Sequence, residues 1–362
     1  MLISRAPFAA ALITALALTA PHHAQACTAF ALPGYAIVGK SYDWHIAEGF
    51  LLVNKRGMKK VALLSSPKAK PTRWVSRHGS VTFNQYGRGM PNGGMNDAGL
   101  VVEILWLNAT RYAPIPTGQP AVNELQWIQL LLDQAATLDE ALKLARTHGI
   151  SPVHGKVHYL VCDAQSRCAV VEHVDGKQVI TRGASLPVPA ITNNTYAQSL
   201  SYWRGDGSRA GRGSLARFAR AADVVRPKGK SSKLANPVKT AFRTLVGVQS
   251  GSYSKWQIVY DQRRKVVHFR QAGAKTTQLR VALSDLRFDC GSTIRFADLT
   301  GALGKKKKGR QNEGLQAWTL SKNQRLVRLT LGKLGLPPAL QKVVAAYPGY
   351  LRCAAIPELK AR

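Results

Sequence analysis

Ala24-Gln25-Ala26-Cys27-Thr28-Ala29-Phe30 is the stretch of sequence around which the rest of the chain can be interpreted. Two alanines separated by one residue are typical of the site at which a secretory leader is cut, and here they directly precede a cysteine. Cleavage after Ala26 would make Cys27 the first residue of the mature chain. It would then carry a thiol and a free α-amino group, whose usual pKa values of roughly 8.5 and 7.7–8.0 let one deprotonate the other. The stretch therefore predicts a nucleophile and its base on one residue.

The 26 residues that end at Ala26 have the other features of a secretory leader. Arg5 supplies positive charge, and residues 8–19 are apolar. No later segment is long and apolar enough to be expected to span a bilayer. We therefore expect an exported protein, periplasmic or secreted. Acylation of Cys27 as a lipoprotein is the alternative, but such leaders usually have leucine three residues before the cysteine, where this chain has Ala24.

The five cysteines are an odd number, so that in an exported chain one of them stays unpaired. Cys162 and Cys168 flank a polar stretch between two apolar runs, which predicts a hairpin with a disulfide across its turn. Cys290 and Cys353 would then form the second pair and tie the C-terminal segment to the main body. Cys27 is left free, as a nucleophile must be. Five reduced, buried thiols are the alternative, which export disfavours.

The net charge is +32, and +31 without the leader, whose one charged residue is Arg5. A surface of this kind attracts polyanions, which in a cell envelope are phosphorylated lipid head groups or acidic polymers. We find no motif typical of nucleic-acid recognition and expect no nucleic-acid partner. The densest basic run, residues 305–310, is interpreted as a solvated loop.

The order of the predicted elements indicates the fold class. Short strand-like runs alternate with turn residues from Cys27 onward. Helical periodicity is found in residues 122–135, 138–146, 215–225 and 237–246. Further strands lie between and after these helices. Strands, helices, strands, helices and strands in this order predict two packed antiparallel sheets with helices outside.

Some patterns that can mark ligand sites receive an ordinary structural interpretation. The glycine-rich residues 87–94 are followed by an extended run, so we interpret them as a backbone turn and not as a phosphate-binding loop. His154 and His158 lie too far apart along a strand to share a metal, and we assign them no role. The tryptophans expected in the core are Trp44, Trp127 and Trp256.

Three further residues supply what an N-terminal cysteine needs for catalysis. It needs a group that orients its amine, a donor for the oxyanion and a positive charge that favours the thiolate. Asp43 lies just beyond a strand that can pair with the first strand. Asn193 offers an amide donor at a strand end, and Arg217 offers a cation at the start of a helix.

Taken together, these residues resemble the choloylglycine hydrolase family of N-terminal-nucleophile hydrolases, which contains bile salt hydrolases and penicillin V acylases. The matching segments occur in family order and are Cys27-Thr28-Ala29, the Asp43 segment, Met95-Asn96-Asp97-Ala98-Gly99-Leu100, the helix around Trp127, Thr192-Asn193, Ala216-Arg217-Phe218 and Val259-Tyr260-Asp261. The family implies an α+β fold of four layers, αββα, in which two antiparallel sheets lie between helical layers. Residues 27–304 would form this domain. Residues 305–362, a basic and partly helical extension packed on it, lie outside the resemblance.

The resemblance implies a role for each candidate residue. Cys27 is the nucleophile, and its own α-amino group is the general base. Asp43 accepts a hydrogen bond from that amine, Asn193 donates to the oxyanion, and Arg217 lies near the sulfur and favours the thiolate. The implied reaction is hydrolysis of a linear amide through a thioester on Cys27, without metal or cofactor.

Two positions depart from the family pattern. Lys40 stands where bile salt hydrolases have an arginine three residues before the aspartate, which keeps the charge and loses the planar fork. Trp106 stands ten residues after Asn96, where bile salt hydrolases have asparagine and penicillin V acylases tyrosine. We expect the indole of Trp106 to line the acyl pocket and its backbone amide to serve the oxyanion. Lys40 and Asn96 are further candidates for substrate or oxyanion binding.

The first hypothesis is an exported cysteine amidohydrolase that cleaves small N-acyl amides of the penicillin V, N-acyl homoserine lactone or N-acyl amino acid type. The aromatic residue at Trp106 favours an aromatic or fatty acyl group over a steroid. A bile salt hydrolase, acting on conjugated bile acids, is the alternative within the family. The alternative from another class is a cationic envelope-binding protein with little catalysis, because the charge attracts anionic surfaces without specificity. A homo-oligomer is left open.

Overall fold

The computed structural model describes residues 26–226, 234–273, 278–300, 309–310 and 314–355. The expected leader up to residue 25 and residues 305–308 of the basic run lie outside these ranges. Within them, no helix combines the length and the apolar composition that crossing a membrane requires.

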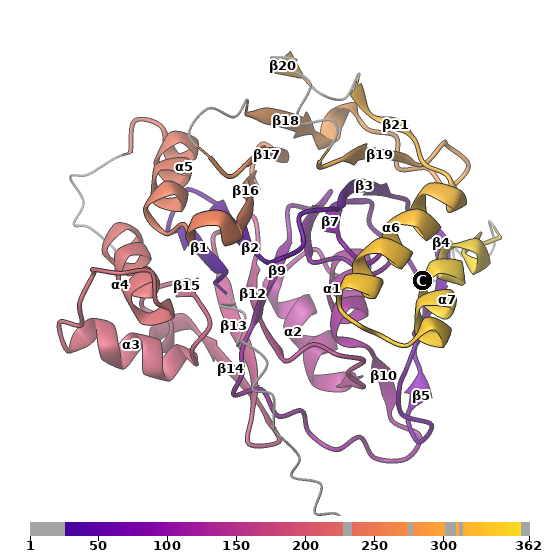
Figure 1. Cartoon of the computed structure of the whole chain (residues 1–362), viewed down its shortest axis with the longest axis horizontal. Helices are drawn as coiled ribbons and strands as arrows, with labels where there is room; N and C mark the ends of the chain where they lie inside the picture. The colour runs from indigo at the N-terminus through magenta and orange to yellow at the C-terminus, as the bar shows by residue number, and fades with distance from the viewer. Residues whose placement is uncertain (1–25, 227–233, 274–277, 301–308, 311–313, 356–362) are drawn as a thin grey trace, which may run out of the picture.

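Two large sheets form the centre of the described structure (Figure 1). In the first sheet, seven described strands pair in the order β15-β1-β2-β16-β17-β18-β20. These strands are β1 (Thr28–Leu32), β2 (Ile37–Asp43), β15 (Ala190–Ile191), β16 (Ser254–Asp261), β17 (Val266–Gln271), β18 (Leu279–Ala282) and β20 (Gly309–Arg310). Neighbours are antiparallel except for β18 and β20, which are parallel. The strand that directly follows Cys27 therefore lies inside a sheet, between β2 and β15.

The second sheet has nine described strands in the order β14-β13-β12-β9-β8-β7-β3-β19-β21, all antiparallel to their neighbours. They are β3 (Phe50–Asn54), β7 (Ser80–Asn84), β8 (Gly93–Asn96), β9 (Val101–Trp106), β12 (Val157–Cys162), β13 (Cys168–Val174), β14 (Lys177–Arg182), β19 (Arg295–Asp298) and β21 (Gln316–Ala317). Small sheets join β4 (Met58–Val61), β6 (Arg73–Val75) and β22 (Arg352–Cys353), and β5 (Lys70–Pro71), β10 (Pro120–Val122) and β11 (Gly149–Ile150).

Helices cover the outer face of each sheet. The first sheet packs against α4 (Ser214–Val225) and α5 (Pro237–Gly247), with α3 (Tyr196–Arg204) beside α4. The second packs against α1 (Glu124–Gln134) and α2 (Leu138–Thr147). Helix α2 begins with a capping box between Thr137 and Glu140.

The side chains of β9 show why this strand is buried on both sides. Val101 and Leu105 belong to the apolar cluster between the two sheets, whereas Val102 and Ile104 belong to the cluster under α1 and α2. Successive side chains of a strand point to opposite faces, so an inner strand of a layered fold must be apolar on both. The predicted α+β fold of two antiparallel sheets between helical layers is confirmed.

Both predicted cysteine pairs are present as disulfides. Cys162 and Cys168 lie opposite each other on β12 and β13, with an S–S distance of 2.12 Å. Cys290 and Cys353 join segments 63 residues apart, with an S–S distance of 2.04 Å. All five cysteines are described, and Cys27 is free.

The C-terminal segment forms two helices, α6 (Leu320–Lys333) and α7 (Pro338–Ala346), which pack on the glycine-rich turn between β7 and β8. The Thr330 hydroxyl donates to the Gln85 carbonyl at 2.9 Å, and the Asn323 side chain accepts from the Arg88 backbone N at 2.8 Å. Gly87 has a φ of +92°, and a Cβ there would lie 2.7 Å from a methyl group of Val327. The turn is thus glycine-rich because the backbone turns there and α6 approaches it closely.

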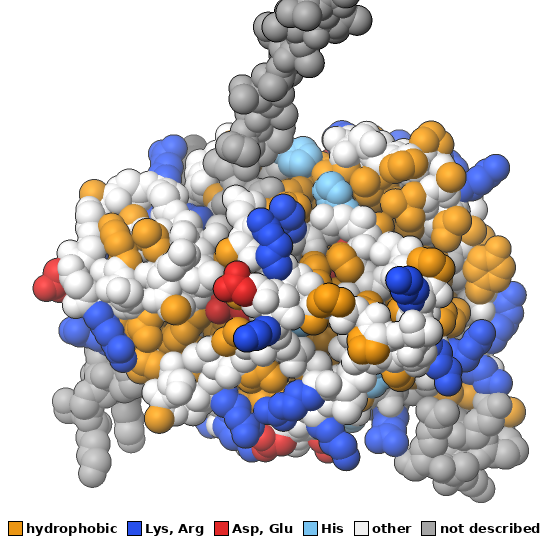
Figure 2. Space-filling model, turned by 90° about the horizontal axis from the view of Figure 1, so that it is seen from below, with side chains coloured by type: hydrophobic (Ala, Val, Ile, Leu, Met, Phe, Trp, Pro, Cys, Tyr) orange, Lys and Arg blue, Asp and Glu red, His pale blue; other side chains and the backbone are white. Residues whose placement is uncertain are grey.

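Basic side chains are spread over the surface. Figure 2 shows a face on which Lys and Arg outnumber Asp and Glu and alternate with apolar side chains. On this face, the positive charge is therefore dispersed and does not form one patch.

The turn under α6 gives a test of this packing. We expect Gly87→Ala to lower the free energy of unfolding by about 2–4 kcal/mol, because the new Cβ meets both an unfavourable φ and the Val327 methyl group. Gly118→Ala is the control, since Gly118 has a φ of +81° with nothing within 4 Å of its Cβ position. That variant should lose only about 1–2 kcal/mol. Equal losses in chemical denaturation would contradict the close approach of α6.

Candidate active site

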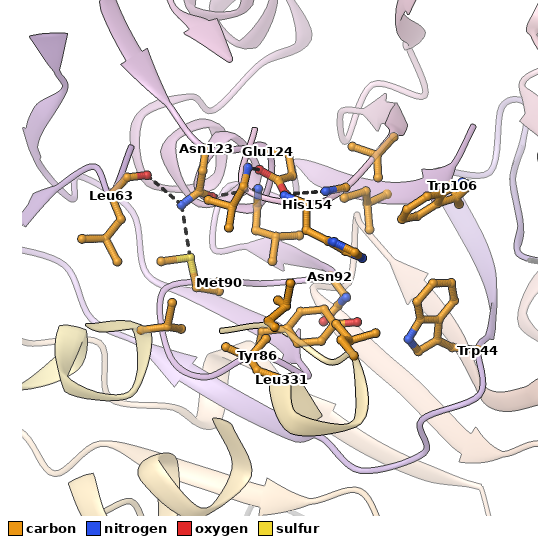
Figure 3. A pocket seen from close by; sticks show the side chains of 18 of the residues that line it. Trp44, Leu63, Tyr86, Met90, Asn92, Trp106, Asn123, Glu124, His154 and Leu331 are labelled. Carbon is orange, nitrogen blue, oxygen red and sulfur yellow. Dashed lines mark hydrogen bonds between the residues drawn. The ribbon is translucent and has the colours of Figure 1, made fainter. Parts of the chain in front are cut away.

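A pocket of about 320 Å³ lies between the second sheet and the C-terminal helices, and the Cys27 side chain forms part of its wall. Most lining side chains are apolar, and they come from segments that are far apart in the chain (Figure 3). Besides Cys27, residues 42–44 and residues 123–125, four groups contribute. From β9 and its surroundings come Ile104, Leu105 and Trp106; from the segments after β4 and β7 come Leu63, Leu64, Tyr86 and Met90; from residues 153–157 come Val153, His154 and Val157; and from α6, α7 and their connection come Leu331, Leu334, Leu336, Leu340, Val343 and Val344.

Cys27 is held next to Asp43 by strand pairing. The register of β1 and β2 sets Thr28 opposite Ser41, so that Cys27 lies beside the end of β2. Its Sγ atom accepts a hydrogen bond from the backbone N of Asp43 at 3.4 Å and lies 3.5 Å from the Asp43 carbonyl oxygen. The thiol is 6% exposed. The thiol therefore has a fixed position at the pocket wall.

The surroundings of the thiol act on its pKa in opposite directions. Burial raises the pKa of Cys27 above its usual value and is the largest influence. The Lys40 cation opposes it, as does the Arg217 guanidinium to a smaller extent. Both cations therefore lower the pKa of Cys27 relative to the effect of burial alone.

The Asp43 carboxylate is fully buried and only partly satisfied. Its Oδ1 atom accepts from the Ser41 hydroxyl at 2.7 Å, but Oδ2 accepts no hydrogen bond of normal geometry from the described residues. Burial raises the pKa of Asp43, and the hydroxyls of Ser254 and Ser41 partly offset this. Asp43 was expected just beyond a strand, but it is the last residue of β2, which is lengthened by pairing with both β1 and β16. Among the described residues, one oxygen of this carboxylate is thus left without a hydrogen bond of normal geometry.

Arg217 ties the N-terminal strand to Asn193. Its Nη1 atom donates to the carbonyl oxygens of Ala26 and Cys27, the latter at 2.6 Å, and to the Thr28 hydroxyl at 2.8 Å. Its Nη2 atom donates to the Asn193 side-chain oxygen at 2.8 Å. Burial lowers the pKa of Arg217 to about 10. Three of its hydrogen bonds are to the backbone and hydroxyl around the cysteine, so Arg217 positions the start of β1 in addition to its electrostatic effect.

Asn193 connects this arginine to the pocket wall. Its Nδ2 atom donates to the Trp106 carbonyl at 2.9 Å, and its backbone N donates to the Ser214 hydroxyl at 2.8 Å. A side-chain amide has two N–H donors, and the bond to Trp106 uses one of them. The structure thus brings Cys27, Asp43, Asn193 and Arg217 together.

The remaining candidates have different positions. Trp106 lines the pocket as expected, with its ring 5.9 Å from that of Trp44. Lys40 is buried behind the wall, where its amine donates to the Ile104 carbonyl and lies 3.7 Å from Glu103. The pKa of Glu103 is raised to about 7, mainly by burial and in spite of the Lys40 cation. Lys40 is not among the described lining residues, so its influence on the site is electrostatic.

Asn96 is not brought to the pocket. Its side-chain amide donates to the carbonyls of Leu132 and Ala135 at the end of α1, at 3.0 and 2.7 Å. Its side-chain oxygen accepts from the backbone N of Ala98 and of Leu100. Asn96 therefore joins the β8–β9 turn to α1, and the expectation that it binds substrate or an oxyanion is replaced by this structural role.

Several pocket residues were not expected from the sequence. Trp44 was expected in the core, but its ring lies in the pocket opposite Trp106 (Figure 3). His154 was given no role, and it also lines the pocket. The Glu124 carboxylate fixes the loop that carries it by accepting from the backbone N of Val153, His154 and Gly155 at 2.7–2.9 Å. Trp127 and Trp256 are buried in the core as expected.

The comparisons with known proteins agree with this geometry. The family model described as acyl-coenzyme A:6-aminopenicillanic acid acyl-transferase matches residues 34–278. The chain belongs to this family. The match covers Asp43, Asn193 and Arg217, begins after Cys27 and ends before α6.

Individual relatives point the same way. The chain is 27% identical over 299 residues to penicillin V acylase from Pectobacterium atrosepticum, covering 68% of this chain and 78% of that protein. Penicillin V acylase from Agrobacterium tumefaciens has a similar structure, with a TM-score of 0.68, 24% identity and coverage of 81% and 98% of the two chains. A conjugated bile acid hydrolase mutant from Clostridium perfringens gives a TM-score of 0.62, 15% identity and coverage of 78% and 98%. The predicted choloylglycine hydrolase relationship is confirmed, and with it the enzyme class, a hydrolase of non-peptide C–N bonds.

The electrostatic influence of Lys40 gives a second test. Lys40→Met removes the larger of the two cationic influences that lower the pKa of Cys27. A nearby cation stabilises the thiolate, so its loss raises the thiol pKa. We expect the pH midpoint of Cys27 alkylation by iodoacetamide to move to higher pH, with Lys59→Met, at an exposed position, as the control. An unchanged midpoint in Lys40→Met would show that Lys40 does not act on the thiol.

Proposed function

We propose that the protein is a cysteine amidohydrolase that cleaves the C–N bond of small N-acyl amides through a thioester on Cys27. The observation that carries this proposal is the position of the Cys27 thiol, which lies in the wall of an apolar pocket and contacts the backbone of Asp43, whose buried carboxylate is only partly hydrogen-bonded. A nucleophile, a group to orient its base and a site for an acyl group then occur in one place.

Cleavage of the chain after Ala26 would complete the catalytic groups. It replaces the peptide N–H of Cys27 by a free α-amino group, which can take the thiol proton. A protonated amine has three donors, and the Asp43 Oδ2 atom is a buried acceptor without a normal partner. An ion pair with Asp43 would orient the amine and satisfy that oxygen. The step that exports the protein would thereby also create its general base.

The first half of the reaction forms the thioester. The Cys27 sulfur attacks the carbonyl carbon of the substrate, and the second N–H of the Asn193 amide and the Trp106 backbone N–H donate to the resulting oxyanion. Arg217 holds Asn193 by its side-chain oxygen and so fixes the direction of that donor. The C–N bond then breaks, and the leaving amine takes the proton from the α-ammonium group.

The second half regenerates the enzyme. A water molecule gives its proton to the α-amino group and attacks the thioester carbonyl. Collapse of this second tetrahedral intermediate breaks the C–S bond, and the sulfur recovers its proton. The products are a carboxylic acid and an amine.

The substrates we propose are penicillin V, N-acyl homoserine lactones and N-acyl amino acids. The penicillin V acylases among the relatives support the first of these. The apolar pocket supports an acyl group without polar substituents, because a buried polar group without a partner is costly. Hydrolysis of conjugated bile acids is supported by fold similarity alone, at 15% identity.

We also propose that the protein is exported to the periplasm or secreted. The Ala-x-Ala sequence before Cys27 and two disulfides in the described chain support this, since disulfides persist in oxidising compartments. The net charge of +31 would add a nonspecific attraction to anionic envelope surfaces.

Intact-mass measurement of the exported protein should give a chain that begins at Cys27. A mature chain that starts earlier would contradict the α-amine mechanism.

The catalytic assignment is tested by Cys27→Ala and Asp43→Asn, scored by amine released from a panel of N-acyl substrates. We expect Cys27→Ala to reduce turnover to background, because no nucleophile remains. Asp43→Asn, which keeps the shape and loses the charge, should lower kcat by roughly 100-fold, because the α-amine remains but loses the anion that orients it as general base. Arg220→Lys is the control on α4, because Arg220 bonds backbone carbonyls of Gly247 and Gly211 instead of the site. Full activity of Cys27→Ala would sink the proposal.

A further inference from the structure

We infer that α6, α7 and their connection bind the acyl group of the substrate and make the enzyme selective for long, unbranched aliphatic acyl chains. This inference rests on the proposed function and deepens it. It concerns a part of the chain that the family match does not include, because that match ends at residue 278.

The C-terminal segment contributes a continuous aliphatic wall. The pocket residues that it supplies are Leu331, Leu334, Leu336, Leu340, Val343 and Val344. None of them carries a polar or aromatic group, so this wall offers dispersion contacts and no hydrogen bonds. An acyl group that lies against it must be able to bury its whole surface without a polar partner. A hydrocarbon chain meets that requirement.

The pocket has two ends of different character, which gives the direction of the bound chain. Trp44 and Trp106 lie at one end in Figure 3, whereas Leu63, Met90 and Leu331 lie toward the other. The aromatic end is the catalytic end, since Trp44 directly follows Asp43 in the chain and the Trp106 carbonyl is bonded to Asn193. A substrate carbonyl at Cys27 would thus direct its acyl chain past the two rings and along the C-terminal helices.

The wall is held in place before any substrate binds. The Cys290–Cys353 disulfide ties the chain beyond α7 to the segment before β19. Lys333 at the end of α6 pairs with Glu48 at 2.5 Å, and Thr330 donates to the backbone after β7. Because these contacts already fix the two helices, the protein loses less conformational entropy when an acyl group binds.

One side chain of the wall is unusually exposed for its type. Val343 is 52% exposed although it lines the pocket. Covering apolar surface is favourable, so an acyl chain long enough to reach α7 would gain from contact with Val343 where a short one would not. Selectivity for length follows from this exposed lining position on α7.

The first measurement is kcat/KM for amides of one amine with acetyl, hexanoyl, dodecanoyl and phenoxyacetyl groups. We expect kcat/KM to rise with chain length by roughly three- to fourfold per added methylene until the pocket is filled, as the usual burial of a CH₂ group gives. The dodecanoyl amide should exceed the phenoxyacetyl amide, which reaches only the aromatic end.

The second measurement compares two tryptophan substitutions on the C-terminal helices. Leu340→Trp fills the pocket, and we expect at least a tenfold loss of kcat/KM for the dodecanoyl amide with little change for the acetyl amide. Leu329→Trp is the matched control, because Leu329 lies on α6, is 42% exposed and is not among the lining residues. Val343→Asn should also lower kcat/KM for the dodecanoyl amide more than for the acetyl amide. Because its position is exposed and tolerates polar residues, this variant tests the inference even if Leu340→Trp fails to fold.

A binding assay separates this inference from the proposed reaction. Calorimetry with Cys27→Ala should show tighter binding of the dodecanoyl than of the acetyl amide, and adding Leu340→Trp should remove the difference. If wild type cleaves no amide but this binding preference is found, the acyl site stands and the proposed function fails. If amides are cleaved without dependence on chain length, or if Leu329→Trp and Leu340→Trp behave alike, the proposed function stands and the acyl site is refuted.

Discussion

Antiparallel pairing of β1 with β2 sets Thr28 opposite Ser41, and this brings the Cys27 sulfur to 3.4 Å from the backbone N of Asp43. The rest of the site depends on that register, because a slip by one residue would turn the side chains of β1 to the opposite face of the sheet. Arg217 secures it from α4 by binding the carbonyls of Ala26 and Cys27. The proposed nucleophile is thus placed by hydrogen bonds of the backbone, which do not vary with substrate.

The parts that could be predicted from sequence are those with a local chemical signal. An odd number of cysteines and a polar turn between Cys162 and Cys168 predicted two disulfides and a free Cys27, which the structure has. The order of strands and helices predicted the layers for the same reason, because a half-buried strand or helix has apolar residues at regular intervals. Asp43, Asn193 and Arg217 came from short motifs in family order, and the structure joins them through hydrogen bonds and strand pairing.

What could not be predicted depends on contacts between distant segments. Asn96 belongs to a family motif, and its neighbours in the sequence do not show that the end of α1 lies beside it. In the fold, its side-chain amide donates to two backbone carbonyls there. Trp44 was expected in the core because tryptophan side chains are usually buried. The pocket beside it is formed with Trp106 and the C-terminal helices, which are distant in the sequence. The apolar pattern of α6 and α7 fits any helix that packs on a domain, so it did not indicate a pocket.

The nucleophile and the aliphatic wall lie at opposite ends of the chain, on β1 and on α6 and α7, and they meet only in the folded molecule. Substitutions at Leu340 or Val343 reshape the pocket without touching the strand register, the Asp43 carboxylate or the Arg217 contacts. Mutations in these helices would therefore change which acyl groups the pocket binds, while the groups proposed to cleave the bond stay in place. A fold divided in this way is evolvable, because its substrate range can change while the reaction stays the same.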